Sequence, residues 1–122
     1  MMKEYQKCAK ELLEFIEKSP TAFQTVANLK EVFAGLGFWE LKETEKWETE
    51  PGQGYYVTRN DSSLIAFRMP QTDTPKGFHI SAAHGDSPAF KVKESPEMAV
   101  EAAYLKLNTE KYGGMILSTW LD

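Results

Sequence analysis

The segment from Gly77 to Ala83 is the feature that most constrains how this chain can fold. It contains no charged residue, and only one histidine and one serine interrupt its small and apolar side chains. Such a run is typical of a strand that is buried on both faces in the middle of a sheet. The polar sequence His84-Gly85-Asp86-Ser87-Pro88 follows it directly. A buried strand with a polar tip predicts an α/β sheet, in which ligands commonly bind at the carboxyl ends of the strands.

Two helices are predicted before this strand. From Met2 to Lys18, apolar residues recur at helical spacing between Lys and Glu, which indicates an amphipathic helix with one face to bury. A second helix is expected to begin at Ser19-Pro20, with the serine hydroxyl accepting a hydrogen bond from a free helix N–H. It is expected to end within residues 34–37, where either glycine can adopt a left-handed cap. The predicted inner side of this helix consists of apolar residues: Phe23, Val26, Ala27, Val32 and Phe33.

From Phe38 onward the pattern is that of strands. A short strand is predicted over 38–41, followed by a polar loop over 42–54. The segments 55–58 and 63–67 flank Arg59-Asn60-Asp61-Ser62, whose Asn and Asp favour a tight hairpin turn. Further strands are predicted over 90–93, 104–108 and 115–121. The last of these stops at Asp122 in mid-pattern, so we expect the chain to be a piece of a longer protein.

The composition excludes several classes of partner. The net charge is −4, and the 14 Lys and Arg are scattered among 18 acidic residues, so no nucleic acid is expected as a partner. No apolar run approaches the roughly 20 residues that span a bilayer, and no signal-peptide core follows the charged start, so no membrane association is expected. The single cysteine, Cys8, cannot form an internal disulfide, and a cytoplasmic location is therefore predicted.

His84 and Asp86 are the residues that best fit a metal site. Histidine is a common zinc ligand, and its second ring nitrogen needs a partner that fixes the tautomer; an aspartate two residues on can be that partner. The alternative is that both residues are merely structural, because a His-x-Asp sequence is frequent by chance. The pair does not complete a zinc site, which needs at least three protein ligands. His79 is interpreted as structural, because its odd spacing from His84 places the two on opposite faces of a strand.

Other polar and aromatic residues are interpreted without a catalytic role. Trp39, Trp47 and Trp120 are expected to be core or interface residues. The loop after the first strand carries four glutamates that are expected to be simply solvated: Glu43, Glu45, Glu48 and Glu50.

Three blocks of the sequence resemble the M18 family of zinc aminopeptidases. The stretch from Ser81 to Lys93, with Ala83-His84-Gly85-Asp86-Ser87-Pro88 and Lys91-Val92-Lys93, resembles the S-A-H-x-D-S-P…K-V-K stretch of that family. The residues from Tyr104 to Asp122 resemble the block that follows it, and those from Leu12 to Thr21 resemble the family's start. The resemblance covers essentially the whole chain. Gly85 stands where the family often has Thr, which removes a hydroxyl but no ligand.

The resemblance implies a two-zinc aminopeptidase in which a metal-activated water attacks the peptide bond after the first residue. His84 matches a zinc ligand, and Asp86 matches the catalytic acid that supports that ligand. Asp122 is left out of the metal site, because its block belongs to an inserted domain in the family. The implied fold is α/β: residues 1–88 are the N-terminal part of an α/β/α catalytic domain, and residues 89–122 are the start of an inserted, β-rich dimerisation domain.

Two functions follow as alternatives. The first is a portion of a zinc-dependent, homo-oligomeric aminopeptidase acting on peptides, some members of the family preferring acidic N-terminal residues and others neutral ones. The general base and the remaining ligands would then lie beyond Asp122, so the 122-residue chain alone is expected to be inactive. The second is a non-catalytic interaction module in which the His-x-Asp strand end is structural.

Overall fold

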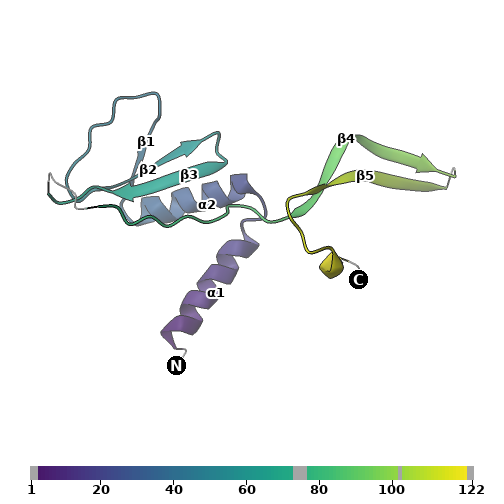
Figure 1. Ribbon diagram of the computed structural model, residues 1–122, viewed down its shortest axis with the longest axis horizontal. Coiled ribbons are helices and arrows are strands. Elements are labelled where there is room, and N and C mark those ends of the chain that lie inside the picture. The colour runs from purple at the N-terminus through teal and green to yellow at the C-terminus, as the bar shows by residue number, and fades with distance from the viewer. Residues whose placement is uncertain (1–2, 73–76, 102, 121–122) are drawn as a thin grey trace. The chain divides into compact units, whose positions relative to one another are not determined.

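The computed structural model describes residues 3–72, 77–101 and 103–120, and the chain divides into two compact units, Met1–Asp86 and Ser87–Asp122 (Figure 1). The first unit contains the helices α1 (Glu4–Glu17) and α2 (Ala22–Gly35) and the strands β1 (Trp39–Leu41), β2 (Gly54–Arg59) and β3 (Ser63–Arg68). The second contains the strands β4 (Ala89–Val100) and β5 (Tyr104–Tyr112) and a 3-10 helix, Leu117–Trp120. The mixed α/β composition agrees with the predicted class. None of these helices is long and apolar enough to cross a bilayer.

The sheet of the first unit has the strand order β1-β2-β3. Strand β1 pairs with β2 in parallel, and β2 pairs with β3 as an antiparallel hairpin. The predicted hairpin is confirmed, and its turn contains Asn60 and Asp61 at φ of 51° and 50°. Both residue types tolerate this left-handed conformation better than most others do, which is why the turn forms at this point.

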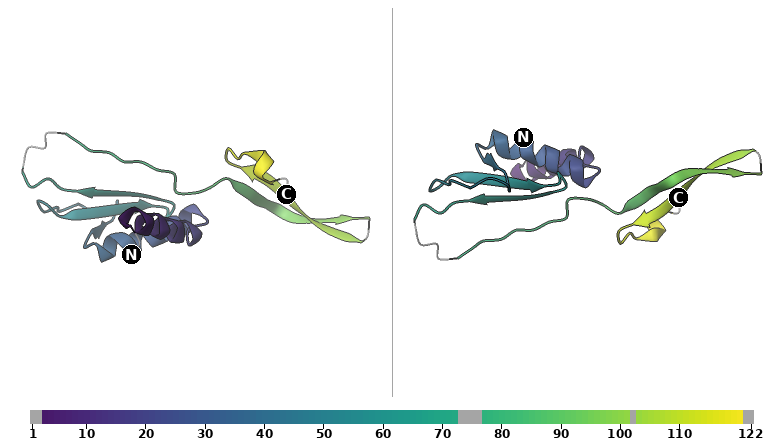
Figure 2. Two further views of the ribbon diagram at one scale, coloured as in Figure 1. Left: turned by 90° about the horizontal axis from the view of Figure 1, so that it is seen from below. Right: turned by 90° about the horizontal axis from the view of Figure 1, so that it is seen from above.

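Helix α2 covers one face of this sheet (Figure 2). On that face the ring of Phe33 lies 5.1 Å from the ring of Phe38 and 6.2 Å from that of Tyr56, measured between centroids. Lys30 of α2 forms an ion pair with Glu40 of β1, with 2.8 Å between Nζ and Oε1, and this hydrogen bond raises the pKa of Lys30. Aromatic packing and one ion pair thus hold the helix against the sheet.

The opposite face of the sheet carries a second aromatic group. Tyr55 points away from α2, because its neighbour Tyr56 contacts Phe33 and successive strand residues face opposite sides. Its side chain is fully buried, packs against Trp39 and Phe67, and accepts a hydrogen bond at 2.8 Å from the N–H of Glu50. The ring of Trp47 stacks on Phe67. Trp39 and Trp47 thus make ring contacts on this face, but they are 53% and 41% exposed and are not core residues, so that part of the prediction is wrong; an interface role stays a prediction. The side chain of Trp120 lies outside the described part.

Both helices are confirmed, but two details of α2 were predicted wrongly. Its N-cap is Thr21, whose Oγ1 accepts a hydrogen bond from the N–H of Gln24, whereas the Ser19 hydroxyl accepts one from the Asn28 side chain. The predicted inner side is right for Val26 and Phe33 and wrong for three exposed residues: Phe23, Ala27 and Val32. The stripe that turns inward instead includes Thr25, because helical spacing places it beside Val26 and one turn before Leu29. The predicted end within 34–37 is confirmed, with Gly37 at φ 77°.

The central strand predicted over 77–83 does not form in this chain. The segment is unpaired, and Phe78 and Ile80 are 86% and 88% exposed. A buried strand needs neighbours that bind its backbone N–H and C=O groups on both sides. In the described part of the chain no strand pairs with this segment, so the prediction is wrong for these 122 residues.

The second unit is a long, twisted hairpin. Strands β4 and β5 include the predicted strands 90–93 and 104–108 and extend well beyond them, with an irregularity in the register between Val92 and Glu97. The strand predicted over 115–121 is wrong: residues 117–120 form the 3-10 helix, and Leu121 lies outside the described residues. The N–H and the hydroxyl of Thr119 both donate to the carbonyl oxygen of Ile116, which favours a helical turn where no partner strand is available.

Candidate metal site

His84 and Asp86 lie in the first unit, where the extended segment ends in a bend at Gly85 and Asp86. The Nδ1 atom of His84 lies 3.3 Å from Oδ1 of Asp86. The histidine side chain is 94% exposed and the aspartate side chain 26% exposed. The structure thus brings together the two residues that the sequence singled out, with the imidazole open to solvent and the carboxylate half-buried.

This geometry fits one zinc ligand and its supporting group. With the carboxylate next to Nδ1, the neutral imidazole carries its proton on Nδ1 and leaves the lone pair of Nε2 for a metal ion. In a histidine that binds zinc, a carboxylate is one of the usual hydrogen-bond partners of the ring nitrogen that does not bind the metal. The described residues contain no cluster of three His, Cys, Asp or Glu side chains, whereas a zinc site needs at least three protein ligands. His84 and Asp86 therefore fit one part of a zinc site, namely one ligand and its supporting carboxylate.

A cavity of about 880 Å³ borders this turn within the first unit. Its wall is formed by α1, α2, β3 and the segment 79–85, and both histidines line it. Residues 77–84 do not form a strand, so the strand alternation that was expected to place His79 and His84 on opposite faces does not apply. His79 and His84 therefore border the same space.

Thr25 of α2 is the residue near the site that sequence reasoning missed. It is 8% exposed, it lines the same cavity, and its Cγ2 lies 3.7 Å from the position that a Cβ on Gly85 would occupy. No local pattern links residues 25 and 85, since sixty positions separate them. Asp122, which was excluded from the metal site, lies outside the described residues.

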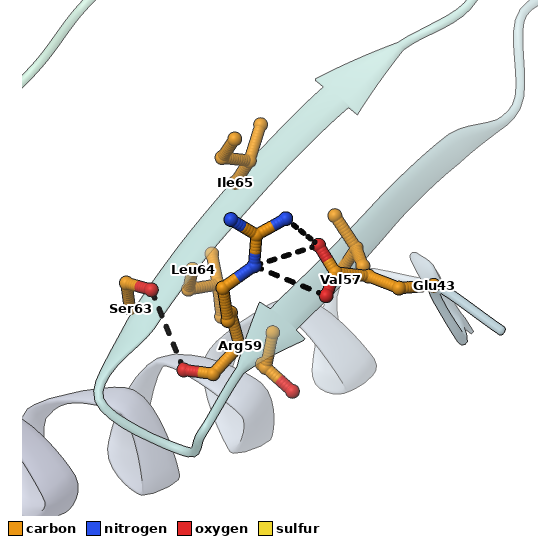
Figure 3. A pocket seen from close by; sticks show the side chains of 7 residues that line it. Glu43, Val57, Arg59, Ser63, Leu64 and Ile65 are labelled. Atoms are coloured by element: carbon orange, nitrogen blue, oxygen red, sulfur yellow. Dashed lines mark hydrogen bonds and ion pairs between the residues drawn. The ribbon is translucent and has the colours of Figure 1, made fainter.

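A second, smaller pocket of about 180 Å³ lies on the β2–β3 hairpin (Figure 3). The guanidinium of Arg59 donates to both carboxylate oxygens of Glu43, at 2.7 Å from Nη2 and 3.1 Å from Nε. These hydrogen bonds lower the pKa of the Glu43 carboxyl and raise the pKa of Arg59. Glu43 is thus more than a solvated acid. It ties the loop after β1 to the hairpin. Among the described residues that line the pocket, Glu43 is the one acid and is held by Arg59, and the Ser63 hydroxyl donates to the carbonyl oxygen of Arg59.

The chain matches a family model described as Aminopeptidase I zinc metalloprotease (M18) over residues 15–122. It is 53% identical over 122 residues to a curated protein of Clostridium novyi named "Probable M18 family aminopeptidase 2", and 43% identical over 112 residues to a protein of the same name from Pseudomonas aeruginosa. The matches cover 99% and 91% of this chain but 28% and 26% of those relatives. The chain therefore spans little more than a quarter of their length.

Solved structures resemble the chain as well. The Ape4 protein in a cryo-EM complex with Nbr1 is 42% identical, with a TM-score of 0.85 over 94% of this chain and 22% of that one. The mApe1 dodecamer of S. cerevisiae is 25% identical, with a TM-score of 0.76 over 98% of this chain and 28% of that one. Because the family model extends over most of the residues and the relatives agree with it, the chain belongs to the M18 family of aminopeptidase I zinc metalloproteases.

Proposed function

We propose that this chain supplies the N-terminal portion of a zinc-dependent aminopeptidase, with His84 as a zinc ligand and Asp86 as the acid that supports it. The observation that carries the proposal is the 3.3 Å approach of Asp86 Oδ1 to His84 Nδ1 in a chain of this family. The exposed imidazole leaves its Nε2 accessible to a metal ion.

The two residues have separate tasks in this proposal. His84 would bind zinc through Nε2, and Asp86 accepts a hydrogen bond from the Nδ1–H and so holds the ring in the tautomer that can bind. Zinc, when bound, supplies the Lewis acidity that activates water for attack on a peptide carbonyl. The other ligands, the general base and the partners of a second zinc ion come from the rest of the protein. The 122 residues alone are accordingly expected not to hydrolyse peptides.

The substrate class is proposed from the relatives' names. An aminopeptidase removes the N-terminal residue of a peptide, and acidic N-terminal residues are among those that we expect it to accept. The net charge of −4 argues against a nucleic acid as a partner, and none is proposed. From the sequence features described above, we propose that the protein is located in the cytoplasm and does not associate with a membrane.

The two units are proposed to have different roles: residues 1–88 belong to the catalytic domain and residues 89–122 to an inserted dimerisation domain. The β4–β5 register places four apolar residues, Phe90, Val92, Leu105 and Leu107, on one face of the hairpin together with Glu97, Thr109 and Lys111, and the four are 46%, 52%, 68% and 63% exposed. Such a face is typical of an interface. Together with the dodecameric mApe1 relative, it supports a homo-oligomer.

The experiment compares the full-length protein with its His84→Ala variant. Zinc content is measured by elemental analysis, and hydrolysis is measured with aspartyl and leucyl anilides. We expect His84→Ala to lose zinc and activity together, while the matched control His79→Gln keeps both. Unchanged zinc and activity in His84→Ala would contradict the proposal and favour the interaction module. Hydrolysis by the isolated 122-residue chain would show that the proposed division of the site is wrong.

A further inference from the structure

Apart from the tyrosines Tyr55 and Tyr56, Thr25 is the one residue with a polar side chain that is buried among the described residues. Its Oγ1 donates a hydrogen bond at 3.0 Å to the carbonyl oxygen of Thr21, which also accepts the Thr25 N–H at 2.9 Å. Because threonine is branched at Cβ, a fixed hydroxyl also fixes the direction of its methyl group. Threonine favours a helix less than alanine does, so the helix itself gains nothing from this choice. What distinguishes the position is where the methyl points.

The methyl group of Thr25 faces the backbone of Gly85. A Cβ on Gly85 would lie 3.7 Å from Thr25 Cγ2, which is an ordinary contact distance, and among the described residues other than Gly85 and its chain neighbours His84 and Asp86 no further atom lies within 4 Å of it. Gly85 is not among the glycines with positive φ, which are Gly37, Gly52, Gly77 and Gly113. Its backbone therefore accepts a side chain without strain. At present only a hydrogen atom of Gly85 faces Thr25.

Within the described residues, the contact with Asp86 is the one polar contact of the His84 imidazole. The histidine side chain is 94% exposed, and its 3.3 Å contact with Asp86 is longer than the usual N–H···O hydrogen bond of about 2.7–3.2 Å. The direction of the ring thus depends on where the backbone of the turn lies. Thr25 of α2 borders that backbone: its Cγ2 lies 3.7 Å from the position that a Cβ on Gly85 would occupy, and both residues line the same cavity.

We propose that Thr25 is a positioning residue for His84. Its methyl group packs toward the His84-Gly85-Asp86 turn from the side of α2, limits the movement of that turn, and so sets the direction of the imidazole. The inference rests on the proposed function, because the ligand that His84 is aimed at is zinc. Gly85 leaves the support incomplete, and a methyl group at position 85 would complete it.

Two variants of Thr25 separate its methyl from its hydroxyl. Thr25→Ser keeps the hydroxyl and removes the methyl, whereas Thr25→Val keeps a methyl at the same place and removes the hydroxyl. In the full-length protein we expect Thr25→Ser to weaken zinc binding about tenfold, the low end for residues that orient a ligand. Thr25→Val should bind zinc as the parent does. Gly85→Ala should tighten zinc binding, and the gain should vanish in the double variant Thr25→Ser/Gly85→Ala, because the two positions act through one contact.

Zinc affinity is measured by competition with a chromophoric chelator. The ¹⁵N shifts of the His84 ring in the zinc-free protein report its tautomer: the parent should hold the proton on Nδ1, and Thr25→Ser should average the two forms. Equal zinc affinities in all variants, or equal losses in Thr25→Ser and Thr25→Val, would overturn the inference. If His84→Ala itself retains zinc, the proposed function fails. If His84→Ala loses zinc while Thr25→Ser does not change it, only the positioning role fails.

Discussion

Oδ1 of Asp86 lies 3.3 Å from Nδ1 of His84, and the two residues differ sharply in exposure, at 26% and 94% of their side chains. The carboxylate is the more buried of the two groups, and the imidazole is almost fully exposed to solvent. A histidine in this arrangement has its Nε2 free for a metal ion. Its Nδ1 faces a carboxylate that orients the ring without binding the metal itself.

The first prediction concerns Asp86→Asn in the full-length protein. An amide oxygen can still accept a hydrogen bond from the Nδ1–H, but that bond is weaker than one to a carboxylate. We expect turnover to fall about 10- to 100-fold while much of the zinc remains. Steady-state kinetics and metal analysis on the same samples measure the two effects. The role of Asp86 would be contradicted if this variant had normal turnover, or if it lost zinc as completely as His84→Ala.

The second prediction concerns the ion pair of Glu43 and Arg59. Arg59 lowers the pKa of the Glu43 carboxyl in the folded protein, so the stabilisation is present above the ordinary glutamate pKa and is lost as the pH falls through the lowered value. Arg59→Gln should return the Glu43 pKa toward its ordinary range. A carboxyl NMR titration of both proteins measures the shift, with Glu45, which pairs with Lys42, as the internal reference. An unchanged Glu43 titration in Arg59→Gln would show that the pair does not persist in solution.

The third prediction concerns Gly54 at the start of β2. A Cβ at this position would lie 2.7 Å from the ring of Phe38, which is itself packed between Phe33 and the guanidinium of Arg68. Gly54→Ala should therefore destabilise the first unit by about 1–3 kcal/mol.

Gly35→Ala is the matched control for this substitution. Gly35 lies at the end of α2, and an added Cβ would meet no described atom within 4 Å outside its chain neighbours and the backbone of the helix itself, so the change should be neutral or stabilise by up to about 1 kcal/mol. Urea denaturation followed by tryptophan fluorescence compares the two variants. Equal stabilities would mean that the Phe38 ring moves aside at no cost.

The fourth prediction concerns the segment 77–84. Its backbone amides have no partner strand in the described part of the chain, so they should exchange within seconds in the isolated 122 residues. In the full-length protein we expect the same amides to be strongly protected, because the charge-free sequence suits a strand with a neighbour on each side. Hydrogen exchange with mass spectrometry reads both states, and β2 serves as the protected reference. Rapid exchange in the full-length protein would exclude a central strand here.

Local features of this chain were predicted well because their causes are local. The two helices follow from apolar spacing, and the β2–β3 hairpin follows from Asn60 and Asp61, whose tolerance of positive φ needs no distant contact. The cap of α2 was misplaced by two residues, since Ser19 and Thr21 both offer a hydroxyl. Which of them caps the helix depends on Asn28, which engages Ser19.

The candidate site divides in the same way. The sequence alone identified His84 and Asp86, because two residues so close in the chain can meet through a single bend at Gly85. It also predicted a strand over 77–83 from the lack of charge, but a strand forms only when other strands supply its hydrogen-bond partners. The support under the turn was decided by tertiary structure alone. Thr25 and Gly85 lie sixty residues apart in the sequence. Only the tertiary arrangement of α2 and the segment 79–85 around one cavity brings the methyl group of Thr25 close to the turn that carries the proposed zinc ligand.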